Sequence, residues 1–171
     1  MKKILIIIFL LSSFAAFSQA EKGLPTLGVP ELTDMNNSAV EANNVKLNQP
    51  LLFRLPVLNM DMINSLPKGN YSIKIGLGSR VDLQKKFNLA TSSLSSYFEW
   101  AVETTKNGEK TLTGNLIKDL PANFSGEAVF ELQGNTAGLS EITMEWIKPV
   151  SNAKAAKPQV NKFYITTRSI N

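Results

Sequence analysis

The sequence predicts an all-β fold, an antiparallel β-sandwich of about seven to nine strands. Short segments in which apolar and polar residues alternate recur along most of the chain, and clusters of Gly, Pro and Asn separate them. After the first twenty residues, no stretch of about 12 residues has a convincing helical pattern. The apolar phase of these segments contains large side chains, which favours a filled sandwich over a barrel that holds a ligand.

Residues 1–20 have the three parts of a secretory signal peptide. Lys2 and Lys3 precede an apolar run from Ile4 to Phe17, and small residues end the segment at Ala20. We expect cleavage after Ala20 and export to the periplasm, the cell surface or the medium. The apolar run is shorter than the roughly 20 residues that a membrane span needs, so we expect no span after the leader is removed.

The rest of the chain is expected to form one domain with an extended beginning. Residues 21–44 are predicted as an extended N-terminal lead-in with at most one short strand between Leu27 and Leu32, because Pro25, Pro30 and a polar cluster interrupt them. Residues 45–171 are predicted as the β-sandwich domain. The chain has no cysteine, so this domain must rely on its hydrophobic core for stability.

The strands of the sandwich follow from the alternating segments. We expect them near residues 49–59, 71–77, 97–103, 111–116, 127–132, 141–146 and 162–167. Pro56 cannot donate to a ladder and indicates an edge or a bulge in the first of these strands. Asn107 and Gly108 predict a tight type I′ turn between the third and fourth strands. In the fifth strand, alternation predicts that Val129 and Glu131 point outward.

Two stretches resemble the opening of the immunoglobulin-like repeats found in bacterial surface and adhesion proteins. Val45-Lys46-Leu47-Asn48-Gln49-Pro50-Leu51-Leu52-Phe53-Arg54-Leu55-Pro56-Val57-Leu58-Asn59 resembles their first turn and strand, and Leu66-Pro67-Lys68-Gly69 followed by Tyr71-Ser72-Ile73-Lys74-Ile75 resembles the next. The usual turn glycine is Asn48 here. The resemblance implies an immunoglobulin-like sandwich used in adhesion or as a spacer, without an active site. The chain shows no tandem repetition, so such a domain would stand alone.

Most catalytic chemistry is excluded by composition. The chain has no histidine and no cysteine, which rules out Ser-His-Asp triads, cysteine nucleophiles, and zinc or iron sites with His or Cys ligands. Two S-x-x-K sequences, Ser65 with Lys68 and Ser151 with Lys154, lack the companion motifs of Ser-Lys enzymes. We therefore expect a protein that is not an enzyme and has no cofactor and no metal site.

Three pairs of glutamates, each four residues apart, are the candidate interaction residues. They share the polar phase of the predicted strands and are Glu99 and Glu103, Glu127 and Glu131, and Glu141 and Glu145. Four residues of a strand span about 13 Å, too far for a pair of glycosidase carboxylates. A solvated outer face is the plain interpretation, and an acidic patch for a divalent cation or a basic partner is the alternative. Because like charges on adjacent strands repel, strands with Lys or Thr are expected between the pairs.

The remaining features indicate a core and a polar loop. Trp100 and Trp146 fall in the inward phase and are predicted as core residues rather than sugar-binding platforms. Lysines from Lys148 to Lys162 lack interleaved aromatic residues, so nucleic acid is not an expected partner. The sequence thus predicts a secreted, non-catalytic module with a structural, adhesive or protein-interaction role at the bacterial cell envelope. Other envelope or surface proteins are its expected partners, and the alternative is an exported protein that binds a carbohydrate or small ligand.

Overall fold

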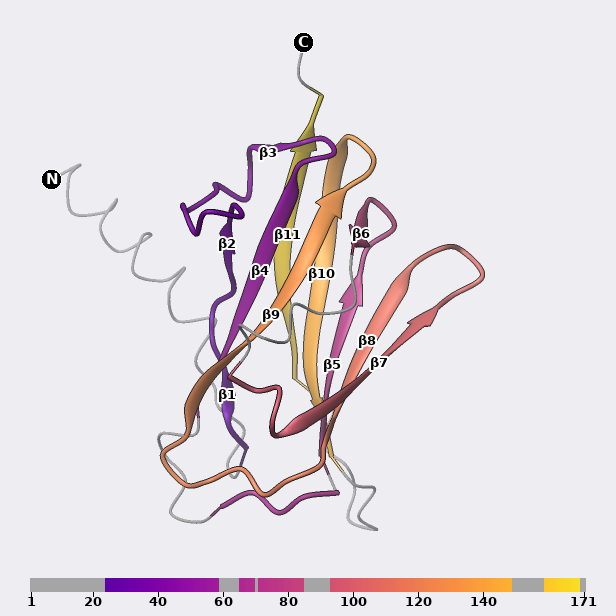
Figure 1. Ribbon diagram of the computed structural model, residues 1–171. Helices are drawn as coiled ribbons and strands as arrows, with labels where there is room; N and C mark the ends of the chain where they lie inside the picture. The colour runs from indigo at the N-terminus through magenta and orange to yellow at the C-terminus, as the bar shows by residue number, and fades with distance from the viewer. Residues whose placement is uncertain (1–23, 59–64, 70, 85–92, 149–158, 170–171) are drawn as a thin grey trace, which may run out of the picture.

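The computed structural model describes residues 24–58, 65–69, 71–84, 93–148 and 159–169. They form eleven strands in two sheets, so the predicted all-β sandwich is confirmed (Figure 1). The strand number exceeds seven to nine because four strands of only two or three residues add to the longer ones. The predicted leader lies outside the described residues. Within them, no helix has the length and apolar character needed to cross a membrane.

Sheet A has five strands around a long central pair. β4 (Pro50–Leu58) pairs antiparallel with β9 (Ser125–Gly134) along its whole length. β6 (Val81–Leu83) pairs with the other side of β9. β1 (Thr26–Leu27) and β2 (Glu31–Thr33) share the other side of β4.

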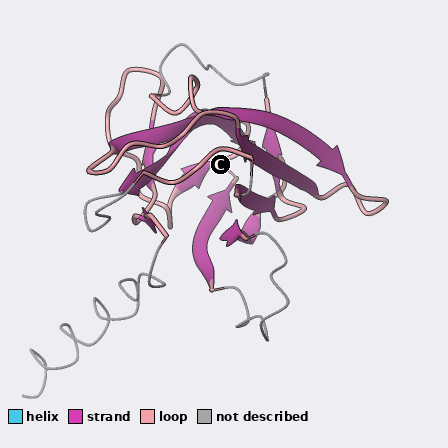
Figure 2. Ribbon diagram, turned by 90° about the horizontal axis from the view of Figure 1, so that it is seen from below, coloured by secondary structure: helices cyan, strands magenta, loops and turns pink. Residues whose placement is uncertain are grey.

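Sheet B has six strands in the order β3-β11-β10-β5-β8-β7. Their bounds are β3 (Val45–Lys46), β5 (Ser72–Leu77), β7 (Phe98–Thr104), β8 (Lys110–Leu116), β10 (Gly138–Ile147) and β11 (Val160–Arg168). All its pairs are antiparallel except β3 with β11. The two sheets lie as two layers when the molecule is viewed from below (Figure 2). β7 therefore ends the sheet on one side, and β11 with its short partner β3 ends it on the other.

Two short strands, and not one long strand, lie along β4, and Pro56 lies at the break between them. β1 pairs at Val57 and Leu58, whereas β2 pairs further along the strand. Between them Gly28 donates its backbone N–H to the carbonyl of Pro56 at 2.8 Å, but Pro56 has no N–H to return the bond. The ladder on this side of β4 is interrupted there. The irregularity that Pro56 predicted is thus a break between β1 and β2, which pair with one side of β4. On the other side, β4 stays paired with β9 along its whole length.

The segment predicted as a lead-in contributes to the core. It contains two short strands where at most one was expected, and both pair with β4. Leu24, Leu27 and Leu32 are buried in the central hydrophobic cluster. The carboxylate of Asp34 accepts hydrogen bonds from the backbone N–H groups of Asn36 and Ser38, each at 2.8 Å, which closes the turn after β2. The backbone of this segment is thus held by pairing as well as by apolar burial.

Asn48 occupies the turn position at which the repeats that this chain resembles have a glycine. Its φ is 60°, in the left-handed region that asparagine tolerates better than most residues. The turn at Asn48 leads from β3 in sheet B to β4 in sheet A. Its backbone N–H donates to the carbonyl of Gly134 on β9 at 2.9 Å. The turn therefore links the two layers at one end of the sandwich.

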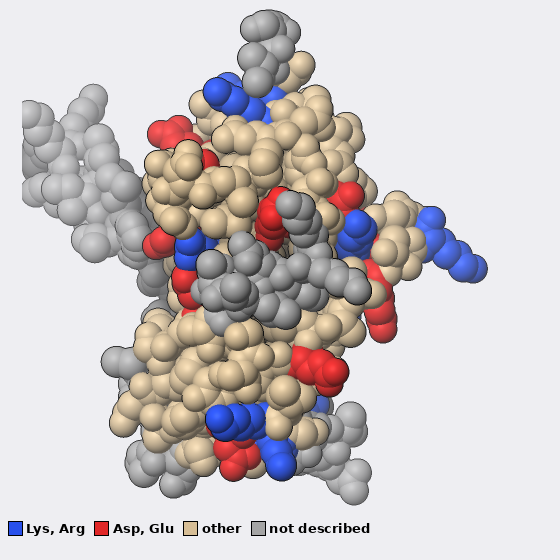
Figure 3. Space-filling view, viewed as in Figure 1, with Lys and Arg blue, Asp and Glu red and all other residues tan. Residues whose placement is uncertain are grey.

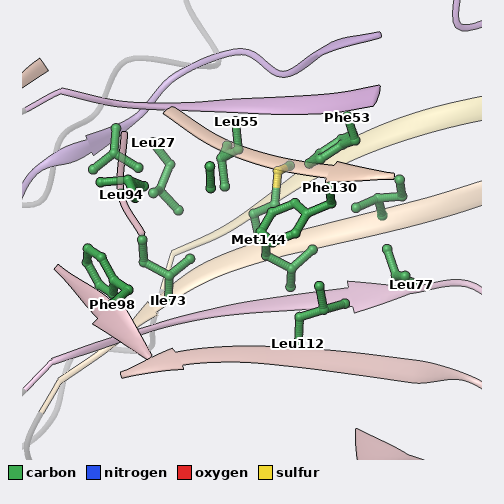
Figure 4. Packing of buried hydrophobic residues seen from close by; sticks show 14 of the residues in the cluster. Leu27, Phe53, Leu55, Ile73, Leu77, Leu94, Phe98, Leu112, Phe130 and Met144 are labelled. Carbon is green, nitrogen blue, oxygen red and sulfur yellow. The ribbon is translucent and has the colours of Figure 1, made fainter. Parts of the chain in front are cut away.

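The core lies between the sheets and is built from the inward phase of each strand (Figure 4). Phe53 and Phe130 from sheet A pack with ring centroids 6.5 Å apart, and Phe53 also meets Phe163 of β11 edge-on. Trp146 is buried and Trp100 is half-buried beside Phe130, as predicted for core residues. These contacts join strands far apart in sequence, so the core fixes how the layers stack.

The turn between β7 and β8 differs from the prediction. A type I′ turn needs positive φ at both central residues, but of Asn107 and Gly108 only the glycine has it, at 81°. Thr105 donates its N–H to the carbonyl of Glu109, and Gly108 donates to the carbonyl of Thr105. The strands are joined by a longer loop with one left-handed glycine, a geometry that also matches the twist of a hairpin. The predicted hairpin is correct, and its predicted turn type is wrong.

The outer face of sheet A differs from the predicted solvated face. Val129 and Glu131 were expected to point into solvent, but both are buried, with 8% of Glu131 exposed. Glu131 lies opposite Leu52, which lies opposite Thr33, and these two side chains are buried as well. Alternation gave the correct side of the sheet for each residue. Alternation could not show that the side chains of Val129 and Glu131 on this face are buried from solvent.

Candidate interaction surface of sheet B

The three pairs of glutamates lie on two sheets. Glu127 and Glu131 belong to β9 of sheet A, and the other two pairs belong to sheet B. Glu99 and Glu103 lie on β7, at the edge of the sheet, whereas Glu141 and Glu145 lie on β10 near its middle. The six glutamates, which were considered as an alternative acidic interaction face, are therefore divided between two sheets.

The two pairs in sheet B share one face but stay apart. Glu145 lies opposite Lys74 on β5, Lys74 opposite Thr113 on β8, and Thr113 opposite Ala101 on β7. The expectation that strands with Lys or Thr separate the acidic strands is confirmed. Neighbouring strands are about 4.8 Å apart, so β10 and β7 are about 14 Å apart. At that distance the two pairs act as separate charges.

Glu141 is held by two neighbours on β11. Its carboxylate accepts a hydrogen bond from the ammonium of Lys162 and another from the hydroxyl of Tyr164, both at 3.0 Å. The bond from Lys162 is the main cause that lowers the pKa of Glu141 below its ordinary value of 4.5. The same contacts raise the pKa of Lys162 and of Tyr164. This carboxylate is thus part of an exposed cross-strand network.

Two further glutamates have a basic partner on the next strand. The carboxylate of Glu145 lies 3.9 Å from the ammonium of Lys74 on β5. Glu127 forms a 2.6 Å ion pair with Arg54 of β4, whose guanidinium also bonds the hydroxyl of Thr33 and the side-chain oxygen of Asn37. Arg54 therefore joins β9, β4 and the N-terminal segment. The charges of Glu127 and Glu145 are thus each paired with a basic side chain of the same protein.

Glu99 and Glu103 differ from these. Both are exposed, and within the described residues no lysine or arginine nitrogen lies within 4 Å of either carboxylate. Across the same ranges no three acidic side chains come together as a metal site would require. Figure 3 shows charged side chains on the hairpin that projects from the side of the molecule. Two acidic charges therefore lie on the edge strand itself.

The hydrogen bonds at the two ends of the β7–β8 ladder show which backbone groups of β7 face away from the sheet. Ile117 donates to the carbonyl of Tyr97 and Thr105 donates to that of Glu109, each at 2.8 Å. In an antiparallel pair, residues that exchange hydrogen bonds alternate with residues whose groups point the other way. The register is unbroken between these ends, so odd-numbered residues of β7 bond β8. The N–H and C=O groups of Val102 and Thr104 point outward from the sheet.

The C-terminal half of β7 is exposed to solvent, in addition to lying at the edge of the sheet. Residues 101–104 are all exposed, including Val102 at 41%. The strand contains no proline, and its pairing with β8 has no bulge. Proline and bulges are common means of blocking an edge against further pairing. In the described part of the chain, β7 pairs with β8 alone (Figure 1).

The other residues singled out by sequence show no site. Ser65 and Lys68 are both exposed, and the backbone N–H of Lys68 bonds the carboxylate of Asp119. Ser151 and Lys154 lie outside the described residues. Sequence reasoning did find the alternation of β7, but it missed that β7 is an edge, since strand order depends on long-range pairing. The exposure of Val102 at an inward-phase position was not signalled by any local pattern.

Comparisons with known proteins find remote structural matches. No protein-family model matches the sequence, and no curated protein sequence matches it. A cohesin module from a family 33 glycoside hydrolase of Clostridium perfringens is 9% identical, with 84% of this chain and 98% of that chain covered and a TM-score of 0.49.

Two matched structures come from bacterial surface proteins. The C-terminal domain of the antigen I/II-family protein AspA of Streptococcus pyogenes is 15% identical, with 83% of this chain and 46% of that chain covered and a TM-score of 0.47. The major pilin SpaA of Corynebacterium diphtheriae is 10% identical, with 75% and 34% covered and a TM-score of 0.45.

Proposed function

We propose that this chain is an exported, non-catalytic β-sandwich module that binds other proteins at the bacterial cell envelope, in a structural or adhesive role. The edge strand β7, which pairs with β8 alone among the described residues, is the observation that carries the proposal. It presents backbone donors and acceptors at Val102 and Thr104, next to exposed side chains. An edge of this kind is a template for pairing with another chain.

The leader-like residues 1–20 support the location. Cell fractionation tests it, together with mass spectrometry of the protein isolated from its host. The expected product begins at Glu21 and is found in an envelope or extracellular fraction. An unprocessed chain in the cytosol would overturn the export part of the proposal.

Site-specific crosslinking in the host tests the interaction. A photo-reactive amino acid replaces Val102 in one variant and Val29 in another, because Val29 is at least as exposed, at 53%, but lies before β2 in the N-terminal segment. We expect a defined crosslinked product with an envelope protein from residue 102 and a much weaker one from residue 29. Equal products from both positions, or none from residue 102, would count against β7 as the interaction site.

A second candidate function, binding of a carbohydrate, is favoured by Tyr164. This aromatic side chain is 48% exposed on the outer face of β11, and its hydroxyl bonds Glu141 beside Lys162. An exposed ring next to hydrogen-bonding groups can stack on a sugar. A glycan array with the wild-type protein and the variant Tyr164→Ala separates the two functions. A glycan signal lost in the variant would favour the second function.

A further inference from the structure

We propose that β7 takes up an extended segment of a protein partner as a seventh strand of sheet B, and that this segment carries Lys or Arg at two positions four residues apart. The inference rests on the proposed function and names the chemistry of the partner. Its starting observation is a sheet edge with outward-facing backbone groups and two exposed carboxylates on one face.

The backbone of β7 offers hydrogen bonds that do not depend on the partner's sequence. The N–H and C=O groups of Val102 and Thr104 point away from β8, at the spacing that an added strand needs. In strand addition these main-chain bonds supply affinity, and alternate side chains supply specificity. The edge alone therefore selects an extended chain but not a particular one.

The side chains of β7 supply the selection. Glu99 and Glu103 project from the outer face of sheet B with Ala101 between them, about 13 Å apart along the strand. Residues opposite each other on paired strands have Cβ atoms about 4.5–5.5 Å apart, within reach of an ion pair. An added strand with basic residues four apart places one opposite each glutamate. On the other face of β7, exposed Val102 favours an apolar residue in the partner.

The same charges argue against a second copy of this chain as the occupant. Two β7 strands can pair symmetrically about Ala101 with their outward backbone groups facing each other. This register places Glu99 of each copy opposite Glu103 of the other. Like charges directly opposite each other destabilise a strand pair. Charge on an edge strand is also a known protection against self-pairing. The glutamates thus disfavour a homodimer in this register, whereas they attract a basic segment in any register that places Lys or Arg opposite them.

Three synthetic nine-residue peptides of Thr and Val test the inference. One carries lysine at positions 3 and 7, one carries glutamate at the same positions, and one carries lysine at positions 3 and 6, which lie on opposite faces of a strand. Binding is measured in nuclear magnetic resonance titrations by the chemical-shift changes of the Val102 and Thr104 amides. The titrations use the mature form of the protein that its host produces. We expect the first peptide to bind at least about 5-fold more tightly than either of the others. Added salt should reduce the difference.

Two variants separate the backbone from the charges. Val102→Pro removes an outward-facing N–H and leaves the ladder with β8 intact, and we expect at least about 10-fold weaker binding of every peptide. The double variant Glu99→Gln with Glu103→Gln keeps the backbone groups, and we expect it to bind the lysine and glutamate peptides equally. Val102→Thr is the matched control for the side chain and should bind nearly as the wild type does.

Each remaining outcome overturns a defined part. Equal binding of the three peptides to the wild type would overturn the basic partner, while a loss in Val102→Pro would still support binding at the edge. Binding unchanged in Val102→Pro would overturn strand addition at β7. If analytical sedimentation shows that the wild type is a dimer and that Val102→Pro is a monomer, the strand that pairs with β7 comes from a second copy of this chain. If an envelope protein crosslinks at residue 102 but basic peptides are not preferred, the proposed function is supported and the basic partner segment is ruled out.

Discussion

The N-terminal segment from Leu24 to Lys46 and the β7–β8 hairpin have opposite relations between sequence pattern and burial. The N-terminal segment has only a weak strand pattern, yet its leucines join the core and its three short strands pair with both sheets. The hairpin has a strong alternating pattern, yet residues 101–104 of β7 are exposed. Alternation shows that a segment can form a strand. Burial depends on what the fold places beside it.

The same contrast appears at the two edges of sheet B. At the end of β11, Thr166 donates to the carbonyl of Ala42, and Leu47 donates to the carbonyl of Arg168. The N-terminal segment thus occupies outward-facing backbone groups of β11. No described segment pairs with β7 in the same way. Within the described residues, the chain itself covers the end of β11 from Thr166 to Arg168, whereas β7 has no strand on its outer side.

The largest expected effect tests whether the N-terminal segment is part of the folded unit. Leu32→Ala leaves a cavity beside β4 and should lower the free energy of unfolding by about 2–5 kcal/mol. Val29→Ala, at an exposed position of the same segment, should change it by less than about 0.5 kcal/mol. Urea unfolding followed by circular dichroism measures both. A cost for Leu32→Ala as small as that of the control would place the segment outside the cooperative fold.

The second prediction tests the direction of the backbone groups of β7. Ala101→Pro removes an N–H that bonds β8 and should cost about 1–3 kcal/mol, because an acceptor on β8 loses its donor. Val102→Pro, one residue further, removes an outward N–H and should cost less than about 1 kcal/mol. Urea unfolding of the two variants gives the difference. Equal costs would contradict the assigned register.

A smaller effect is expected from the polar contacts that hold the N-terminal segment. Arg54→Met removes hydrogen bonds to Thr33 and Asn37 and the ion pair with partly exposed Glu127. We expect a cost of about 1–2 kcal/mol. Lys74→Met, which removes a long and exposed pair with Glu145, is the control and should cost less than about 0.5 kcal/mol. If thermal unfolding shows the same loss for both, Arg54 does not anchor the segment.

The smallest expected effect is a loss of stability in acid. The pKa of Glu141 is lowered chiefly by its bond from Lys162. Partial burial raises the pKa of Asp82, but the bond and charge of Lys110 outweigh it, and the net pKa lies below 3.8. Because both carboxyls have a lower pKa in the folded state, their contribution is present at neutral pH and is lost as the pH falls through the folded values.

A titration monitored by nuclear magnetic resonance checks this contribution. In Lys162→Met, the pKa of Glu141 should rise toward its ordinary value of 4.5, and the pKa of Asp82 should not move. Unfolding experiments should show little change between about pH 7 and pH 5 and a decline below about pH 4. An unchanged Glu141 pKa in the variant would remove the cross-strand network as its cause.

Particular residues show how far the sequence could predict the site. The six glutamates were correctly assigned to the polar phase of strands, and Lys74 and Thr113 do separate the two acidic strands of sheet B. The burial of Glu131 and the position of β7 at an edge could not be predicted. Both depend on strand order and on the packing of distant segments, which a local alternating pattern does not contain.

The sequence by itself determined the chemistry that this protein lacks and the class of its fold. The absence of histidine and cysteine excludes whole groups of active sites, and period-two alternation between turn signals specifies strands with one apolar face. Only the tertiary structure decided which glutamates have basic neighbours, which end of β11 is covered by β3, and which edge strand has no outer partner among the described residues. Those outcomes arise from pairing between segments far apart in the chain, where each strand's neighbours decide what its side chains and backbone groups can meet.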